Sequence, residues 1–140
     1  MQESNQYQDF KINVKIKLAL LWSAVMFCYI YGDYFQLYVP GKVDGLISGQ
    51  NMLDNPFKLL MASLLLAIPA LMVCLSVILK PVINRFLNLL WGTFYTALML
   101  LIAVTSYSKW HMFYVFLAIL ESILTAVIVI NAYKWPKNKE

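Results

Sequence analysis

The sequence predicts an all-α integral membrane protein, a bundle of four transmembrane helices. Of its 140 residues, 61% are hydrophobic and 13% are charged, whereas soluble domains average about 45–50% apolar and about 25% charged residues. The apolar residues gather in four long blocks and are not spread at the spacing of an amphipathic helix. Each block reaches the length of about 20 residues that a helix needs to cross the hydrocarbon layer.

The four blocks have clear boundaries. The first ends at Pro40 and Gly41, which cannot continue a helix, and the second follows Asn55 and Pro56, a capping residue and a proline at the first turn. Only the short stretch SKW separates the third block from the fourth, so these two helices should be antiparallel neighbours. The expected spans are residues 18–39, 57–79, 86–107 and 110–133.

These spans form one transmembrane domain, residues 18–133, between an interfacial tail, 1–17, and a second tail, 134–140. Eight Lys and Arg residues fall on the side of the two tails and three on the opposite side. The positive-inside rule therefore predicts a plasma-membrane protein with both termini in the cytoplasm. The basic residues form no continuous patch, so the expected partner is the lipid bilayer and not nucleic acid. The connection 40–56 is expected to be a flexible turn or a gating loop.

Two acids, Asp33 and Glu121, lie inside expected spans. An ionised side chain at the bilayer centre costs about 2.5–3.5 kcal/mol on insertion scales, and no Lys or Arg lies at the same depth. Each acid must therefore be protonated, hydrogen-bonded or bound to a cation. At 1.5 Å per residue, the two acids differ in depth by roughly 6 Å, so they could share a proton if their helices touch.

Helical spacing places further polar residues on the same faces as the acids. The fourth span carries a polar and small stripe through Glu121, and similar stripes run along the first and third spans. We expect them to converge on one internal site, with His111 either relaying protons to Asp33 or lying solvated at a helix start. The candidate ligand- or proton-binding residues are Asp33, Glu121, Tyr29, Asn88, Tyr95, Thr125 and His111. Alternatively, the same residues only hold helices together through interhelical hydrogen bonds.

Pro69 lies inside the second span, where it removes one backbone donor and leaves the carbonyl of Leu65 without its helical partner. A static bend and a hinge are both consistent with it. The two cysteines, Cys28 and Cys74, lie in apolar runs away from any metal motif and should be buried. Catalytic motifs are missing, so we expect no cofactor and no metal. We therefore expect that the protein is not an enzyme. The remaining enzymatic alternative is a lipid-modifying enzyme that uses the two intramembrane acids.

Four stretches carry a resemblance to a known family: Y-x-Y-G-D at 29–33, A-I-P-A-L-M at 67–72, N-R-F-L-N at 84–88 and L-E-S-I at 120–123. Over nearly its whole length the chain resembles a family of small four-helix bacterial membrane proteins classed as a domain of unknown function. The resemblance implies a bacterial inner membrane, four helices and no assigned activity.

Two functions follow from these expectations. In the first, the intramembrane acids bind or move a small solute, a cation or a proton. Four helices enclose little volume, so this function calls for a homo-oligomer. In the second, the protein is an accessory or scaffold subunit of a larger membrane complex, and the buried polar residues only join its helices.

Overall fold

The computed structural model describes residues 10–136, and within that range the protein is helical without a strand. Four of its helices are long and apolar enough to cross a membrane, which confirms the predicted all-α, four-span architecture. The helices are α1 (Val14–Gln36), α2 (Lys42–Ile47), α3 (Pro56–Ile78), α4 (Pro81–Thr105), the 3-10 helix η1 (Lys109–His111) and α5 (Met112–Tyr133). The outer parts of the two expected tails, 1–9 and 137–140, lie outside the described residues.

The helix boundaries differ from the expected spans where capping residues decide them. α1 begins at Val14 and not at residue 18, because the side chain of Asn13 accepts a hydrogen bond from the backbone N–H of Lys15 at 2.9 Å. α4 begins at Pro81 and not at residue 86, since proline fits the first turn of a helix. The connection expected to be a turn or loop contains α2, which starts after Gly41 in the left-handed conformation (φ 75°).

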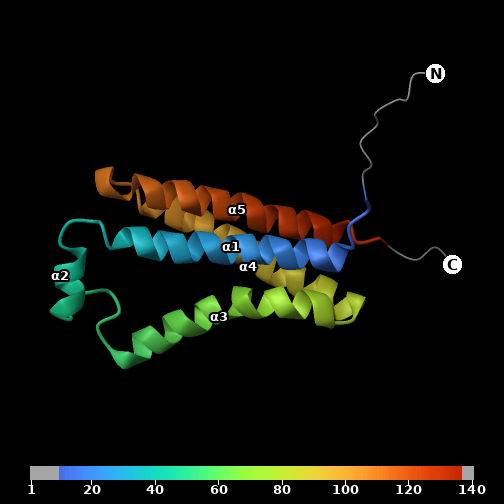
Figure 1. Ribbon diagram of the computed structural model, residues 1–140, viewed down its shortest axis with the longest axis horizontal. Coiled ribbons are helices and arrows are strands. Elements are labelled where there is room, and N and C mark those ends of the chain that lie inside the picture. Colours follow the sequence, from blue (N-terminus) through green and yellow to red (C-terminus); the bar gives the residue numbers. More distant parts are fainter. Residues whose placement is uncertain (1–9, 137–140) are drawn as a thin grey trace, which may run out of the picture.

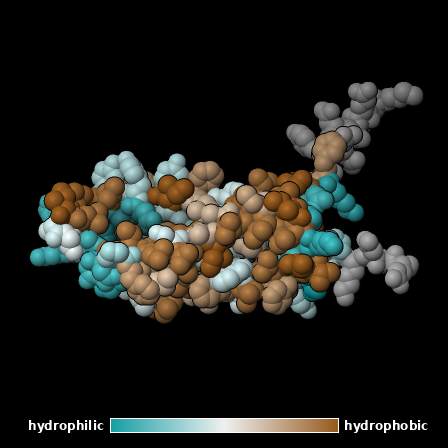
Figure 2. Space-filling view, turned by 90° about the horizontal axis from the view of Figure 1, so that it is seen from below, coloured by the Kyte–Doolittle hydropathy of each residue, from teal (hydrophilic) through white to brown (hydrophobic). Residues whose placement is uncertain are grey.

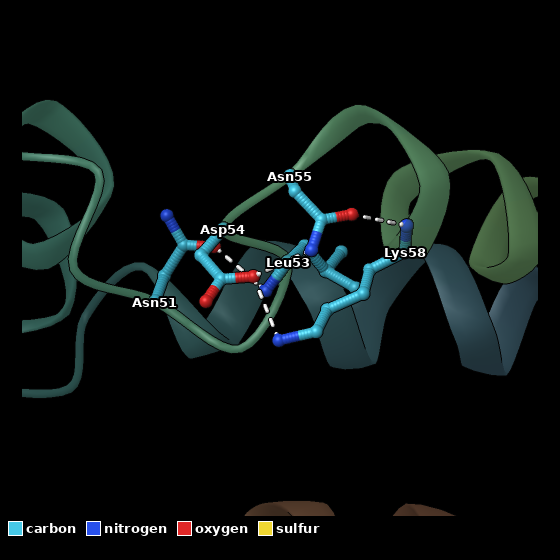
Figure 3. A network of polar contacts seen from close by, with 5 residues as sticks. All are labelled: Asn51, Leu53, Asp54, Asn55 and Lys58. Atoms are coloured by element: carbon cyan, nitrogen blue, oxygen red, sulfur yellow. Dashed lines mark hydrogen bonds and ion pairs between the residues drawn. The ribbon is translucent and has the colours of Figure 1, made fainter.

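The first turn of α3 is held by its own loop (Figure 3). The side chain of Asn55 accepts from the backbone N–H of Lys58 at 2.9 Å, and Lys58 Nζ lies 2.7 Å from Asp54 Oδ1. Just before them, the Asn51 side chain accepts from the N–H of Leu53 at 2.8 Å. This capping explains why α3 begins where the sequence signal placed it.

The bundle has two distinct ends (Figure 1). Both described chain ends and the turn between α3 and α4 lie at one end, which we call the termini end. The connection that contains α2 and the turn that contains η1 lie at the other, which we call the loop end. α1 lies between α3 and α5, and α4 packs mainly on α5.

Small residues let α4 and α5 approach closely. A Cβ added at Gly92 would lie 2.8 Å from Val129 Cγ2, which is too close for a real contact. Ala103 on α4 and Ala118 and Ala132 on α5 are also buried. Such small residues allow close approach of membrane helices, where packing drives association.

α3 is packed along only part of its length. Pro69 and Met72 are buried in its second half, whereas its first half moves away from the other helices toward the loop end (Figure 1). The large apolar side chains of that first half are exposed: Phe57, Leu59, Leu60, Met61 and Leu64. Cys28 is buried as expected, but Cys74 is exposed, because it points away from the face of α3 that carries Met72. The expectation of two buried cysteines was therefore wrong for one of them.

The surface suits a bilayer. On the face seen in Figure 2, apolar residues cover most of the middle, and strongly hydrophilic residues gather toward both ends. At the termini end, two basic side chains bind carbonyls at helix ends: Lys15 Nζ donates to Val77 O at 3.2 Å, and Arg85 Nε donates to Ala132 O at 3.1 Å. Cations are favourable at the C-terminal end of a helix dipole, so these contacts stabilise the ends of α3 and α5.

Candidate functional site

A fully satisfied polar network lies near the termini end. Trp22 Nε1 on α1 donates to Asn88 Oδ1 on α4 at 2.8 Å, and Asn88 Nδ2 donates to Asn84 Oδ1 at 2.7 Å. Asn84 Nδ2 in turn donates to the backbone carbonyl of Ser76 on α3. All four residues are completely buried. The network joins three helices, and its partners account for Asn88 by packing alone.

Tyr95 and Thr125, two other candidate residues, also have partners. The hydroxyl of Tyr95 on α4 donates to Leu65 O, the carbonyl that Pro69 leaves without its helical donor. Thr125 Oγ1 lies 2.9 Å from Glu121 O and 2.8 Å from Thr96 Oγ1 on α4. Tyr95 therefore ties α3 to α4, and Thr125 ties α5 to α4. Both residues therefore form hydrogen bonds between helices, as expected if the buried polar residues only hold the helices together.

A separate cavity of about 20 Å³ lies between α1, α4 and α5, nearer the loop end. Its lining consists of Cys28, Tyr29, Gly32, Asp33, Met99, Ile102, Tyr114, Ala118 and Glu121. The volume is enough for about one water molecule. Three of the seven candidates, Asp33, Glu121 and Tyr29, meet here, whereas Asn88, Tyr95, Thr125 and His111 lie outside the lining.

Glu121 is buried in this cavity without a partner. Only 4% of the residue is exposed, and within residues 10–136 its carboxylate neither accepts a hydrogen bond nor forms an ion pair. Tyr29 lines the same cavity, and its hydroxyl is buried with no hydrogen-bond partner among the described residues. Buried polar groups are nearly always hydrogen-bonded, so the Tyr29 hydroxyl is an exception among the described residues, and Tyr29 lines the same cavity as Glu121.

Asp33 connects the cavity to a larger space. It is exposed and lines both the cavity and a groove of about 840 Å³ at the loop end. Ile102 and Tyr114 also line both spaces, so these three residues lie at the junction between them. His111 lines the groove, with its Nδ1 2.8 Å from Ser108 Oγ. The groove therefore brings His111 and Asp33 into one solvent-accessible space.

The chemistry of the site is that of acids and hydroxyls. In the described part of the chain, no group of three His, Cys, Asp or Glu side chains could hold a metal ion. The cavity has no Lys or Arg in its lining. The arrangement can hold water and bind or pass a proton through carboxyl and hydroxyl groups.

Sequence reasoning placed Ala118 in the stripe of polar and small residues that carries Glu121, but it missed Gly32. Gly32 on α1 and Ala118 on α5 both line the cavity. Helical spacing puts Ala118 and Glu121 on one face of α5, and the packing of α1 against α5 brings Gly32 to that face. Lys42 of the groove was missed as well, because it belongs to a segment expected to be a loop.

The chain belongs to a family of unknown function, DUF6326, whose model matches residues 6–140. This membership confirms the resemblance drawn from the sequence motifs, as far as the family is concerned. Neither a curated protein nor a solved structure matches the chain.

Proposed function

We propose that this DUF6326 protein spans the inner (plasma) membrane of a bacterium with both termini in the cytoplasm, and that it binds a proton at Glu121. The observation that carries the proposal is the position of Glu121: it is 4% exposed, lacks a partner among the described residues and faces a water-sized cavity next to Asp33. An ionisable residue inside a membrane bundle marks a functional site by default.

The orientation rests on charge. The termini end carries six of the described basic residues: Lys11, Lys15, Lys17, Lys80, Arg85 and Lys134. The loop end has Lys42, Lys58 and Lys109, together with Asp44 and Asp54. The excess of Lys and Arg favours the cytoplasm for the termini end, which turns the groove toward the opposite side.

The size of the cavity selects the ligand. A volume of about 20 Å³ admits water and leaves no room for an organic solute. A water molecule there has the carboxylate of Glu121, the hydroxyl of Tyr29 and the carboxylate of Asp33 around it as hydrogen-bond partners. A proton from the groove can then pass by way of Asp33 and water to Glu121, and His111 on the groove wall is a second group that can deliver it.

The path is closed toward the termini end. Trp22, Tyr95, Met99 and Ile128 pack there in one buried cluster. Glu121 therefore exchanges protons with the loop side, and release to the other side requires these side chains to separate or a second copy of the chain to complete the path.

The test is proton binding and flux in reconstituted vesicles. Infrared difference spectra across a pH titration should contain a carboxyl band that Glu121→Gln removes, and a pH-sensitive dye should report proton flux that the same change abolishes. Asp33→Asn should slow the flux, because it interrupts the connection to the groove. The matched control is Asp44→Asn, an exposed acid outside the long helices. An identical titration in Glu121→Gln and in the unchanged protein would refute the proposal.

A second candidate function is that of an accessory subunit in a larger membrane complex. The exposed apolar first half of α3 favours it, since it contributes little to the packing of this chain. This function predicts that a stable protein partner co-purifies in mild detergent and that the double change Asp33→Asn, Glu121→Gln leaves the complex intact. Recovery of the chain alone would count against it.

A further inference from the structure

The groove at the loop end contains an acid and a base that do not pair with each other. Asp33 on α1 and Lys42 on α2 both line it. Within residues 10–136, the one ion pair shorter than 4 Å joins Lys58 to Asp54, outside the groove. Two opposite charges that share a space and stay apart are suited to a ligand that carries both signs, because each can bind the opposite end of it.

The rest of the lining is amphipathic. Apolar side chains contribute Leu37, Leu46, Met52, Leu53 and Ile102. Hydroxyl and amide groups come from Gln36, Asn51, Thr105, Ser106 and Ser108. The volume of about 840 Å³ lies within the range of about 300–1,000 Å³ that is typical of small-molecule sites. A ligand of matching chemistry has two charges, several acceptor oxygens and an apolar part.

The position of the groove places it at headgroup depth. It lies where α1 ends, where α4 ends and where η1 leads into α5. Exposed aromatic side chains of the kind that mark membrane interfaces surround that level: Tyr34, Tyr38, Tyr107 and Trp110. On the side of the groove toward the membrane centre, the exposed apolar first half of α3 offers a surface for the acyl chains of a lipid.

We propose that the groove binds the headgroup of a zwitterionic aminophospholipid, the phosphatidylethanolamine class. The primary ammonium lies at Asp33, where it can donate hydrogen bonds to the carboxylate, and the phosphate lies at Lys42. A trimethylammonium headgroup has no N–H to donate, so phosphatidylcholine binds less tightly. An anionic phospholipid meets Asp33 without a compensating cation and is also disfavoured. This inference does not depend on proton binding at Glu121.

The test is lipid retention by the purified, full-length protein, measured by native mass spectrometry after exchange into an equimolar mixture of phosphatidylethanolamine, phosphatidylcholine and phosphatidylglycerol. The unchanged protein should retain phosphatidylethanolamine in several-fold excess over the other two. Asp33→Asn should bring the retention of phosphatidylethanolamine close to that of phosphatidylcholine, because the charge-assisted hydrogen bond that distinguishes the two headgroups is lost. Lys42→Gln should lower retention of both zwitterionic lipids without changing their ratio, because both carry the phosphate.

Three controls make the outcome unambiguous. Lys58→Gln removes a base that is already paired with Asp54 outside the groove and should change nothing. Glu121→Gln should keep the lipid preference, so failure of the proton proposal and failure of this one are separate results. Equal retention of phosphatidylethanolamine and phosphatidylcholine, or an unchanged ratio in Asp33→Asn, would overturn the inference. Displacement of the lipid by an equal concentration of free phosphoethanolamine would reveal a soluble-zwitterion site and overturn the assignment to a lipid.

Discussion

At the termini end, Trp22, Asn84 and Asn88 bind one another and the backbone of Ser76. Toward the loop end, Glu121 and Tyr29 line a cavity, and the buried hydroxyl of Tyr29 has no partner in the described chain. α1 contributes to both regions, through Trp22 at the network and Tyr29 at the cavity, whereas the two asparagines lie on α4 and Glu121 lies on α5. The sequence signals of the two regions are alike, since each places polar residues on one face of an apolar helix.

The two regions differ in whether their buried polar groups have partners within the described chain. A buried group with partners contributes about 0.5–1.5 kcal/mol to stability, whereas a buried group without one costs about 1–3 kcal/mol. The termini-end network therefore needs no explanation beyond helix association. The Tyr29 hydroxyl beside Glu121, buried without a partner in the described chain, lowers stability instead.

The largest effect is expected at the termini end, from Asn88→Ala. The change leaves Trp22 Nε1 without its acceptor and breaks the link to Asn84. It should lower the free energy of unfolding by about 2–3 kcal/mol, measured by titration with sodium dodecyl sulfate in mixed micelles and followed by circular dichroism. Thr93→Ala, at an exposed position of the same helix, is the matched control. If Asn88→Ala and Thr93→Ala lowered the free energy of unfolding equally, the buried network would contribute no more to stability than an exposed polar residue, and the prediction would be wrong.

A smaller effect is expected from methyl groups added at two glycines, one in each region. Gly92→Ala places a Cβ 2.8 Å from Val129 Cγ2 and should cost about 1–2 kcal/mol by pushing α4 from α5. At Gly32, beside the cavity, the nearest atom to a new Cβ is Leu117 Cδ1 at 3.6 Å, an ordinary contact. Gly32→Ala should therefore change stability by less than about 0.5 kcal/mol.

The same unfolding titration checks both glycine changes, and a second change tests the cause. Val129→Ala removes the atom that the new methyl group meets. It should restore most of the stability that Gly92→Ala loses, because the two changes act on one contact. A Gly32→Ala protein as unstable as Gly92→Ala would mean that the loop-end half is packed as tightly as the rest.

Composition and local signals were sufficient for the fold. Four apolar blocks predicted four helices, and proline and capping residues placed the start of α3. The carbonyl of Leu65 was identified from Pro69 alone, because the missing donor follows from covalent structure. Its actual donor, Tyr95, is 30 residues away and could not be named without the packing of α3 against α4.

The candidate site was only partly predictable for the same reason. Helical periodicity says which residues share a face, but not which faces meet or which polar groups satisfy each other. Thr125 shares a face of α5 with Glu121, and Asn88 and Tyr95 lie on the polar stripe of α4, yet all three have partners of their own. Asp33 and Glu121 meet at one cavity because α1 and α5 pack side by side. The sequence could not predict this pairing, because the four apolar blocks are similar and do not indicate which helices are neighbours.

A similarly small stability effect, and the sharpest test of the comparison, is expected from Glu121→Gln. No hydrogen bond or ion pair of the described residues is lost, and a neutral amide of nearly equal volume replaces a group that is costly to ionise inside a membrane. The free energy of unfolding should stay within about 0.5 kcal/mol or rise by up to about 1 kcal/mol, in the same titration used for Asn88→Ala. A loss of about 2 kcal/mol would instead show that Glu121 holds helices together, as Asn88 does. Proton binding lost with stability unchanged is the result that a functional acid predicts, because a group retained for packing cannot be replaced without a structural cost.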